Sequence, residues 1–330
     1  MKIYFNTYPV AFQCPGGGEI QLLKSKEALE RRGHDVILYN QWEHKLADAD
    51  VVHHFSVQGG SSNFCNYVHQ QRIPLAISPI LWLSDYIDQY PMGEINHLLN
   101  IANVICPNSN AEIDRFAAHF NVAREKYIVT NNGVDSIFFN PVDQSIFREH
   151  FGIFGEFILC VGNIEIRKNQ LALVQAAADL DLDVVLIGNI RDQGYFDDMA
   201  QKFSGKFSYL GFLDHTSEIL RSAYAACSVF ALPSLLETPG LAALEAAACG
   251  SKLVVTQEGC TEEYFGGYAL YVDPKNVGDI SGKLQEAMGQ SVKTKLITGQ
   301  LDFSWDKTAE QLEKAYALAI QNAHVSNSIG

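Results

Sequence analysis

The sequence alternates between short apolar runs rich in Val, Ile and Phe and longer stretches with helical spacing. Strands that alternate with helices of about 10–15 residues indicate β-α-β units and parallel sheets. The alternation runs from "KIYFN" to "YIVTN" and restarts at "FILCVGN", after the segment "NNGVDSIFFNPVD". We therefore predict an α/β chain with two doubly wound, Rossmann-like domains.

The length of the chain supports this division, because 330 residues exceed what one hydrophobic core usually needs. We expect an N-terminal domain over residues 1–148 and a C-terminal domain over residues 149–303. Residues 304–330 carry apolar side chains at helical spacing, such as Leu312 and Tyr316. They predict a C-terminal helix that can pack back on the N-terminal domain.

The charge of the chain argues against nucleic acid as a partner. The formal net charge is -14, and residues 1–150 hold 11 basic against 16 acidic side chains while the remainder holds 13 against 22. Neither half is basic, so at most a peripheral contact with an anionic membrane is expected.

The cysteines and the N-terminus point to a cytoplasmic protein, free or at the inner face of the membrane. The seven cysteines are scattered and form no CxxC pair, which favours buried thiols over disulfides or zinc sites. The start, "MKIYFNTYPV", lacks the apolar core of a signal peptide, and no window approaches 18 uninterrupted apolar residues.

Ligands of open α/β sheets bind outside the carboxyl ends of the strands, so the residues after each strand are the candidates. After the first strand, "CPGGGE" places Gly16, Gly17 and Gly18 at the start of a helix, where amides can approach an anion; a tight turn explains the run equally well. The G-x-G-x-x-G spacing is missing, which disfavours a nicotinamide cofactor. The strand "DVVHHFS" ends in His53 and His54, and we weigh a ligand role and a structural role for His53 equally.

Two cations follow the first strand of the second series. In "NIEIRKNQ", Arg167 and Lys168 stand just before an apolar helix. Adjacent cations there suit a diphosphate, whose charge must be neutralised as a bond to it breaks, although a solvated surface pair is an equal alternative.

The stretch "LLETPGLAALEAAACG" carries the most specific signal. Pro239 suits the start of a helix, so the amides of Gly240 and Leu241 form an anion site at its N-terminus. Glu237 precedes that site and can accept hydrogen bonds from sugar hydroxyls. Glu245 lies about 7–8 Å further along, at a distance suited to a ribose. The alternative is that Glu245 pairs with a core arginine.

Two other chemistries fit less well. Paired carboxylates can hydrolyse a glycosidic bond, but here both lie on one loop and helix and do not flank a ligand. The "DAD" at 48–50 and the "DLD" at 181–183 mimic a metal motif, yet both precede strands. We expect no metal and no other cofactor.

The sequence resembles retaining glycosyltransferases of family 4 (glycosyl transferases group 1), which have the GT-B fold of two Rossmann-like domains facing a deep cleft. "ETPGLAALE" fits the E-x7-E motif of that family, and "EIRKNQ" is similar to its phosphate-binding loop. Weaker landmarks are "PGGGE", "DVVH", "PNSNAEIDRF" and "VTNNGVDSIFF". The resemblance covers most of the chain and is closest over residues 157–275.

The resemblance implies roles residue by residue. Glu237 would contact the donor sugar, Glu245 the ribose, and Arg167 with Lys168 the diphosphate; His53 aligns with a histidine of the family. The amides of Gly240, Leu241 and the Gly16–Gly18 loop would complete the anion cradle. Two positions depart from the family pattern: "ISPILW" lacks a histidine, and Asn163 stands where an arginine is frequent, so that Arg167 must compensate.

We therefore expect a retaining transferase that moves a hexose from a GDP- or UDP-sugar to a hydroxyl of a saccharide or glycolipid, in surface glycan biosynthesis. The catalytic candidates are Glu237, Lys168, Arg167 and His53. The alternatives are an epimerase or phosphorylase on the same fold, or a catalytically silent sugar-nucleotide binder. Trp82, Tyr86 and Tyr90 are aromatic candidates for stacking on an acceptor, or ordinary loop and core aromatics.

Overall fold

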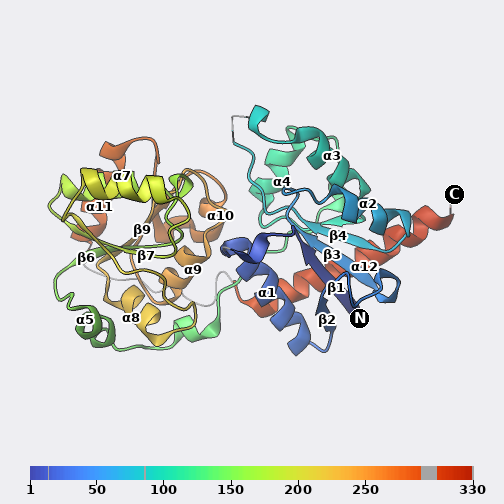
Figure 1. Cartoon of the computed structure of the whole chain (residues 1–330), viewed down its shortest axis with the longest axis horizontal. Helices are drawn as coiled ribbons and strands as arrows, with labels where there is room; N and C mark the ends of the chain where they lie inside the picture. Colours follow the sequence, from blue (N-terminus) through green and yellow to red (C-terminus); the bar gives the residue numbers. More distant parts are fainter. Residues whose placement is uncertain (14, 85–86, 291–302, 329–330) are drawn as a thin grey trace. The chain divides into compact units, whose positions relative to one another are not determined.

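The computed structural model describes residues 1–13, 15–84, 87–290 and 303–328, and divides into two compact units. Unit 1 consists of Met1–Gly133 with Phe303–Gly330, and unit 2 of Val134–Asp302. Each unit has helices packed on both faces of a parallel sheet (Figure 1). The α/β class with two doubly wound domains is confirmed.

The described strands of unit 1 form one parallel sheet in the order β2-β1-β3-β4-β5. Every residue of the central strands β3 and β4 is buried, as expected for strands that are covered on both faces. In this sheet β2 lies on one side of β1, and β3, which follows β2 in the chain, lies on the other side. The direction of winding therefore reverses between β1 and β3. The strands are β1 (Lys2–Thr7), β2 (Asp35–Leu38), β3 (Val51–Phe55), β4 (Leu75–Ser78) and β5 (Val104–Ile105).

The helices of unit 1 bury apolar stripes against both faces of this sheet. One face packs on α2, α3 and α4 around a core that includes Tyr4, Ile95 and Phe116. The other face packs on α1 and on the C-terminal helix α12. The helices are α1 (Gly17–Arg31), α2 (Ser62–Gln70), α3 (Met92–Ile101), α4 (Asn110–Ala117) and α12 (Trp305–Ser328).

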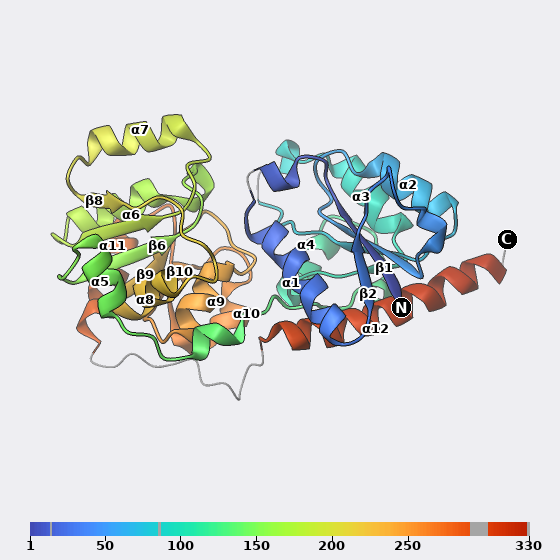
Figure 2. The ribbon, with the colours of Figure 1, turned by 60° about the horizontal axis from the view of Figure 1, so that its bottom comes forward.

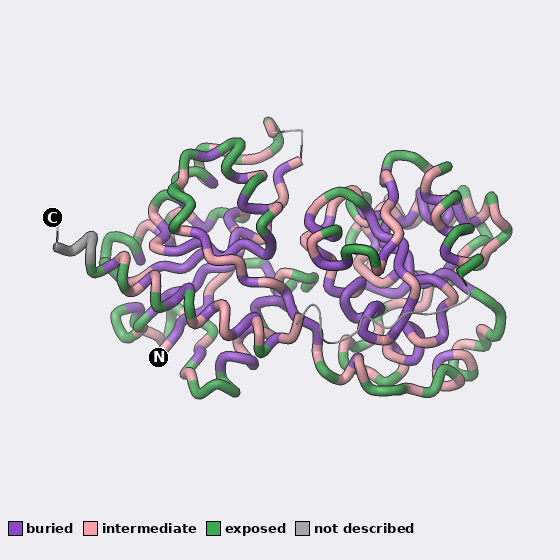
Figure 3. The backbone as a smooth tube through the Cα atoms, turned by 180° about the vertical axis from the view of Figure 1, so that it is seen from behind, coloured by how far each residue is buried: buried purple, intermediate pink, exposed green. Residues whose placement is uncertain are grey.

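Unit 2 has a parallel sheet in the order β11-β10-β9-β6-β7-β8 among the described residues. Its winding reverses between the neighbouring strands β6 and β9. Burial follows the strands, which lie inside, while the covering helices show alternating buried and exposed turns (Figure 3). The strands are β6 (Phe157–Val161), β7 (Asp183–Ile187), β8 (Phe207–Tyr209), β9 (Val229–Leu232), β10 (Leu253–Thr256) and β11 (Ala269–Val272).

The helices of unit 2 also cover both faces (Figure 2). On one side α6 packs on α11, and on the other side α8 packs on α5 and α9. The helices are α5 (Ser145–Phe151), α6 (Gln170–Ala178), α7 (Gln193–Lys202), α8 (Glu218–Ala226), α9 (Leu241–Ala248), α10 (Thr261–Phe265) and α11 (Val277–Gly289).

The structure differs from the sequence prediction in a few elements. "YIVTN" forms only an isolated bridge between Tyr127 and Ile105 and no strand. The short helices α5 and α10 have no counterpart in the prediction, because five to seven residues are too few to show a helical period.

The boundary between the units falls at Val134, earlier than the predicted boundary after residue 148. The reason is that the intervening segment belongs to the core of unit 2. Phe138 packs against Tyr224 with ring centroids 6.0 Å apart. Phe147 stacks on Phe157 at 5.4 Å.

The C-terminal helix α12 packs on unit 1, where it runs alongside α1 (Figures 1 and 2). Its Tyr316 is fully buried and hydrogen-bonds His53 of β3. At the surface, Glu313 accepts two hydrogen bonds from Arg32 at 2.9 and 2.8 Å and a contact from His34 at 2.8 Å. A bidentate arginine-carboxylate pair is the strongest form of a surface ion pair.

This pair predicts a pH-dependent contribution to the stability of unit 1. The hydrogen bonds from Arg32 lower the pKa of Glu313 from 4.5 to about 2, against the opposing effect of burial. A depressed carboxyl pKa stabilises the fold above pH 4.5, and this stabilisation is lost as the pH falls from 4.5 toward 2. We expect Glu313→Gln to lower the free energy of unfolding by about 1 kcal/mol near neutral pH, with the difference from wild type vanishing in acid.

Tryptophan fluorescence during urea unfolding measures this effect, because Trp42, Trp82 and Trp305 all lie in unit 1. Glu27→Gln is the matched control, since Glu27 forms an exposed ion pair within α1. A Glu313→Gln effect that is no larger than the control, or that persists unchanged in acid, would contradict the assignment.

Candidate active site

The candidate site lies at the carboxyl edge of the unit 2 sheet, where the winding reverses. The chain leaves β6 toward α6 and leaves β9 toward α9, so the two loops part at this point of the edge. Such a switch point is where open α/β sheets bind ligands. Both loops carry the predicted residues, with Arg167 and Lys168 after β6 and Glu237 after β9.

The two loops are joined by an ion pair that the sequence did not predict. Lys168 Nζ donates to Glu237 Oε1 at 2.5 Å, and Arg167 Nη1 lies 3.8 Å from the same oxygen. The second guanidinium nitrogen of Arg167 donates to Glu165 at 2.9 Å, and Arg191, from the loop after β7, reaches the other oxygen of Glu165 at 3.2 Å. Positive and negative charges therefore alternate along the edge.

Glu237 is buried, with an exposed fraction of 4%. Burial by itself would raise the pKa of its carboxyl group, but the charges of Lys168 and Arg167 and the hydrogen bond from Lys168 outweigh it and lower the pKa below 4.5. The carboxylate is consequently ionised at neutral pH. An ionised oxygen is a strong acceptor for hydroxyl hydrogen bonds.

The backbone of Glu237 is fixed by the loop that follows β10. Its amide donates to the carbonyl oxygen of Glu258, and its own carbonyl oxygen accepts from the amide of Cys260. Gly259 lies between these two, with a φ of 111°. A Cβ atom at Gly259 would lie 1.9 Å from the carbonyl oxygen of Glu237, so only glycine fits there.

The N-terminus of α9 adjoins this carboxylate. Gly240 caps the helix with a φ of 89°. Among the residues that the structure describes, the amides of Gly240 and Leu241 have no hydrogen-bond acceptor. At the neighbouring helix α6 the amide of Leu171 is instead satisfied by the hydroxyl of Tyr195 at 2.7 Å. The N-terminus of α9 is therefore suited to bind an anion.

Glu245 is buried, with an exposed fraction of 6%, and its carboxylate contacts a tyrosine and a histidine. The Tyr224 hydroxyl donates to Oε2 at 2.7 Å, and Nδ1 of His215 lies 3.2 Å from Oε1. These two contacts come from α8 and from the loop before it, and they hold the carboxylate at the side of α9.

Asn169 ties the loops of the edge together. It adopts the left-handed conformation with a φ of 57°, and its side-chain amide donates to the carbonyl oxygens of Pro233 at 3.0 Å and Pro274 at 2.8 Å. Asn163 lies in the same loop, and its carbonyl oxygen accepts from Gln170 at 2.9 Å. These contacts hold the loops after β6, β9 and β11 in register.

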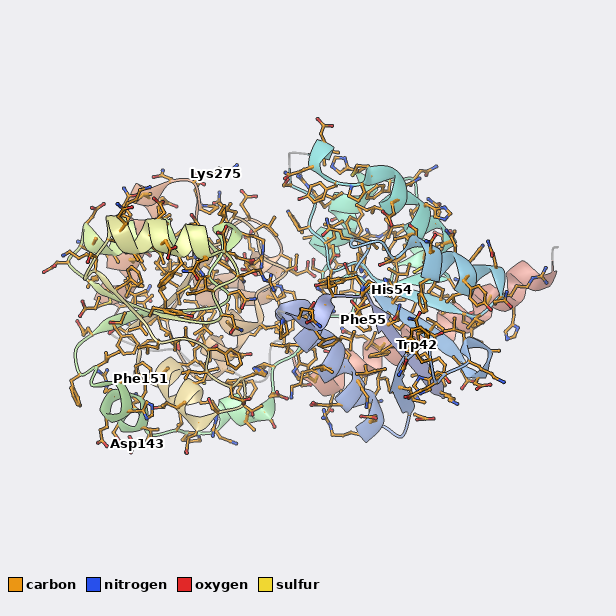
Figure 4. The ribbon with its side chains drawn as sticks, viewed as in Figure 1. Trp42, His54, Phe55, Asp143, Phe151 and Lys275 are labelled. Carbon is orange, nitrogen blue, oxygen red and sulfur yellow. The ribbon has the colours of Figure 1, made fainter. Side chains whose placement is uncertain are left out.

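The prediction for His53 is corrected by the structure. His53 has no exposed surface, and its two ring nitrogens contact the Tyr316 hydroxyl at 2.8 Å and the Ser78 hydroxyl at 3.0 Å. Burial lowers its pKa to about 3. The side chain therefore packs β3 against α12. The adjacent His54 faces the other side of the sheet, where it contacts Asn6 (Figure 4 labels His54 and Phe55).

The glycine loop of unit 1 also differs from its prediction. Gly16 caps α1, but its amide donates to the carboxylate of Glu19 at 2.7 Å, and the same carboxylate accepts from Tyr8 at 2.8 Å. The amide of Gly16 is thus already used within the chain. The anion contacts expected from Gly17 and Gly18 stay a prediction.

Several residues of the edge escaped the sequence prediction. Glu165 and Asn169 follow β6, and Arg191 follows β7. Their place after the carboxyl ends of strands is the signal in the sequence that marks them as candidates. Asn169 also stands just before an apolar helix, and asparagine tolerates the left-handed conformation. His215 and Gly259 gave no signal, because their roles depend on contacts with segments far along the chain.

The aromatic candidates of unit 1 are described in part. Tyr90 accepts a hydrogen bond from the Ser84 amide and donates to the carbonyl oxygen of Trp82 at 3.3 Å. This pairing favours a role in shaping the loop. Tyr86 lies outside the described residues.

Within the described ranges, no group of three or more His, Cys, Asp or Glu side chains could hold a metal ion. In the same part of the chain, no helix has the length and apolarity needed to span a bilayer.

The part of the chain that carries this edge is similar to known proteins. Residues 144–299, which include the whole edge with both glutamates, match the model of the family "Glycosyl transferases group 1". These residues are therefore similar to group 1 glycosyltransferases. The resemblance found in the sequence is confirmed at this level.

The chain is also similar in sequence to two enzymes. It is 28% identical over 250 residues to a D-inositol 3-phosphate glycosyltransferase of Mycobacteroides abscessus, covering 69% of the chain and 54% of that enzyme. It is 24% identical over 249 residues to the O-antigen chain mannosyltransferase B of Escherichia coli, covering 70% and 64%. The chain spans about half the length of the first of these relatives.

Solved structures share the fold of the whole chain. Sucrose-phosphate synthase from Thermosynechococcus elongatus superposes with a TM-score of 0.74 at 16% identity, covering 100% of the chain and 99% of that structure. HepE of Anabaena, in complex with UDP, gives 0.71 at 18% identity, with the same coverage of 100% and 99%. The GT-B fold of the two units is thereby confirmed.

Proposed function

We propose that this chain is a retaining hexosyltransferase, which moves a hexose from a nucleoside diphosphate sugar to a hydroxyl of a saccharide or glycolipid acceptor. The observation that carries the proposal is the Lys168–Glu237 pair beside the N-terminus of α9, at the switch point of the sheet. It combines cations and amides suited to a diphosphate with an ionised carboxylate suited to sugar hydroxyls.

Different residues of the edge bind different parts of the donor. The diphosphate binds the amides of Gly240 and Leu241 and is neutralised by Lys168 and Arg167. Glu237 accepts hydrogen bonds from the sugar. The diphosphate gains negative charge as its bond to the sugar breaks, so these donors stabilise the transition state more than the ground state, each by about 3–4 kcal/mol.

The transfer step follows from this placement. The bond between the anomeric carbon and the phosphate oxygen breaks, and the acceptor oxygen bonds to the same carbon on the same face. The acceptor proton passes to the departing phosphate. Because His53 is buried and bonded on both nitrogens, we assign this proton to the leaving group and not to a histidine.

The relatives support the substrate class. One is named for a cyclitol phosphate acceptor and one for the O-antigen chain, and a structural relative was solved with UDP. We infer a GDP- or UDP-sugar donor, a metal-independent reaction, family 4 membership and a role in surface glycan biosynthesis at the inner face of the membrane.

The experiment incubates the whole protein with UDP- and GDP-hexoses, with and without saccharide acceptors. We expect nucleotide release that depends on the acceptor, and a product with the donor's anomeric configuration by NMR. Glu237→Gln should reduce this rate by at least about tenfold while keeping the fold. Release of an altered sugar nucleotide would establish an epimerase, phosphate-dependent cleavage a phosphorylase, and binding without any release a silent binder.

A further inference from the structure

His215 lies between two carboxylates of unit 2. Its Nδ1 is 3.2 Å from Glu245 Oε1, and its Nε2 is 3.6 Å from Asp135 Oδ2. The three residues come from separate segments: Asp135 precedes the short helix Ser136–Phe139, His215 lies between β8 and α8, and Glu245 lies in α9. The imidazole is 22% exposed, whereas the Glu245 side chain is 7% exposed.

The two oxygens of Glu245 are held by different donors. Nδ1 of His215 lies 3.2 Å from Oε1, where a proton on this nitrogen can be donated to the carboxylate. The hydroxyl of Tyr224 donates to Oε2 at 2.7 Å. Phe138 packs against both rings, with centroids 5.6 Å from His215 and 6.0 Å from Tyr224. The plane of the carboxylate is therefore fixed from two sides.

We propose that His215, braced by Asp135, is a positioning residue that orients Glu245 to accept the ribose hydroxyls of the nucleotide. This inference rests on the proposed function, and it adds a residue that holds Glu245 in place for the ribose contact. A carboxylate free to rotate loses orientation on binding, whereas one held in advance does not.

The proposal makes a prediction that depends on the ligand. His215→Ala should weaken the binding of UDP or GDP by about tenfold, the value of one hydrogen bond to a charged group. It should leave the binding of the 2′,3′-dideoxy counterpart within about twofold, because that ligand has no hydroxyl for Glu245 to accept. His215→Asn should retain most of the ribose preference, since its side-chain amide can replace Nδ1–H.

The measurement is isothermal titration of the whole protein with UDP and GDP and with their dideoxy forms. Glu245→Gln is the reference for loss of the ribose contact. His150→Ala is the matched control, because His150 is an exposed histidine of unit 2 on α5. Circular dichroism of each variant establishes that it is folded.

The outcomes separate this inference from the proposed function. A ribose preference that Glu245→Gln abolishes and His215→Ala leaves intact overturns the role of His215 and leaves the proposed function standing. Equal losses of the ribose and dideoxy ligands in His215→Ala also overturn it, since they indicate general damage to the site. A wild-type protein that binds no nucleotide overturns both.

Discussion

Replacing Lys168 by methionine is expected to lower the free energy of unfolding of unit 2 by about 3 kcal/mol and to abolish nucleotide binding. The buried carboxylate of Glu237 would lose the cation 2.5 Å away, and only Arg167, at 3.8 Å, would remain near. Burial would then dominate and raise the pKa of Glu237, the reverse of the wild-type shift.

The sign of the pH dependence tests this explanation. In the wild type the pKa of Glu237 lies below 4.5, so its stabilising charge persists from neutral pH down to that region. In Lys168→Met the raised pKa lets the carboxyl group take up a proton at a higher pH than in the wild type. The stability difference between variant and wild type should therefore shrink as the pH falls from neutral.

The double variant Lys168→Met, Glu237→Gln separates stability from binding. It removes both charges, so most of the lost stability should return while nucleotide binding stays absent. Hydrogen exchange of unit 2 peptides reports the stability, because all three tryptophans lie in unit 1. If the double variant is no more stable than the single one, the ion pair is not what Lys168 contributes.

Gly259→Ala is expected to be the most damaging small substitution at the site. The new Cβ would lie 1.9 Å from the carbonyl oxygen of Glu237 and 3.0 Å from its amide nitrogen, and backbone atoms cannot yield as a side chain does. The φ of 111° adds strain of about 1–3 kcal/mol for any residue with a Cβ. The loop must therefore shift and carry Glu237 away from Lys168.

We expect this variant to lose transfer activity and nucleotide affinity by at least about a hundredfold, as displacement of a catalytic group by 1 Å does. Activity assays and titration with UDP and GDP measure the two effects. Gly267→Ala is the matched control, because no atom lies within 4 Å of a Cβ there and its φ is not positive. Wild-type activity of Gly259→Ala would show that the loop does not position Glu237.

Local patterns in the sequence were enough to predict most of the fold. Apolar runs such as "FILCVG" and "DVVLIG" are largely buried strands followed by glycine, and their alternation with helices permits few topologies. The helix after Pro239 and the cations after β6 were found by the same local rules. The boundary at Val134 was not, because it depends on where Phe138 and Phe147 bury their rings.

The sequence by itself determined that a parallel sheet would bring Lys168 and Glu237 to one edge, since strand ends and helix starts are written in local order. Only the tertiary structure decided what each charged group does there. His53 and Gly16 follow the expected strands, yet Tyr316 and Glu19 occupy their polar atoms. Those partners come from segments whose approach is set by packing, and packing is not encoded in any local pattern.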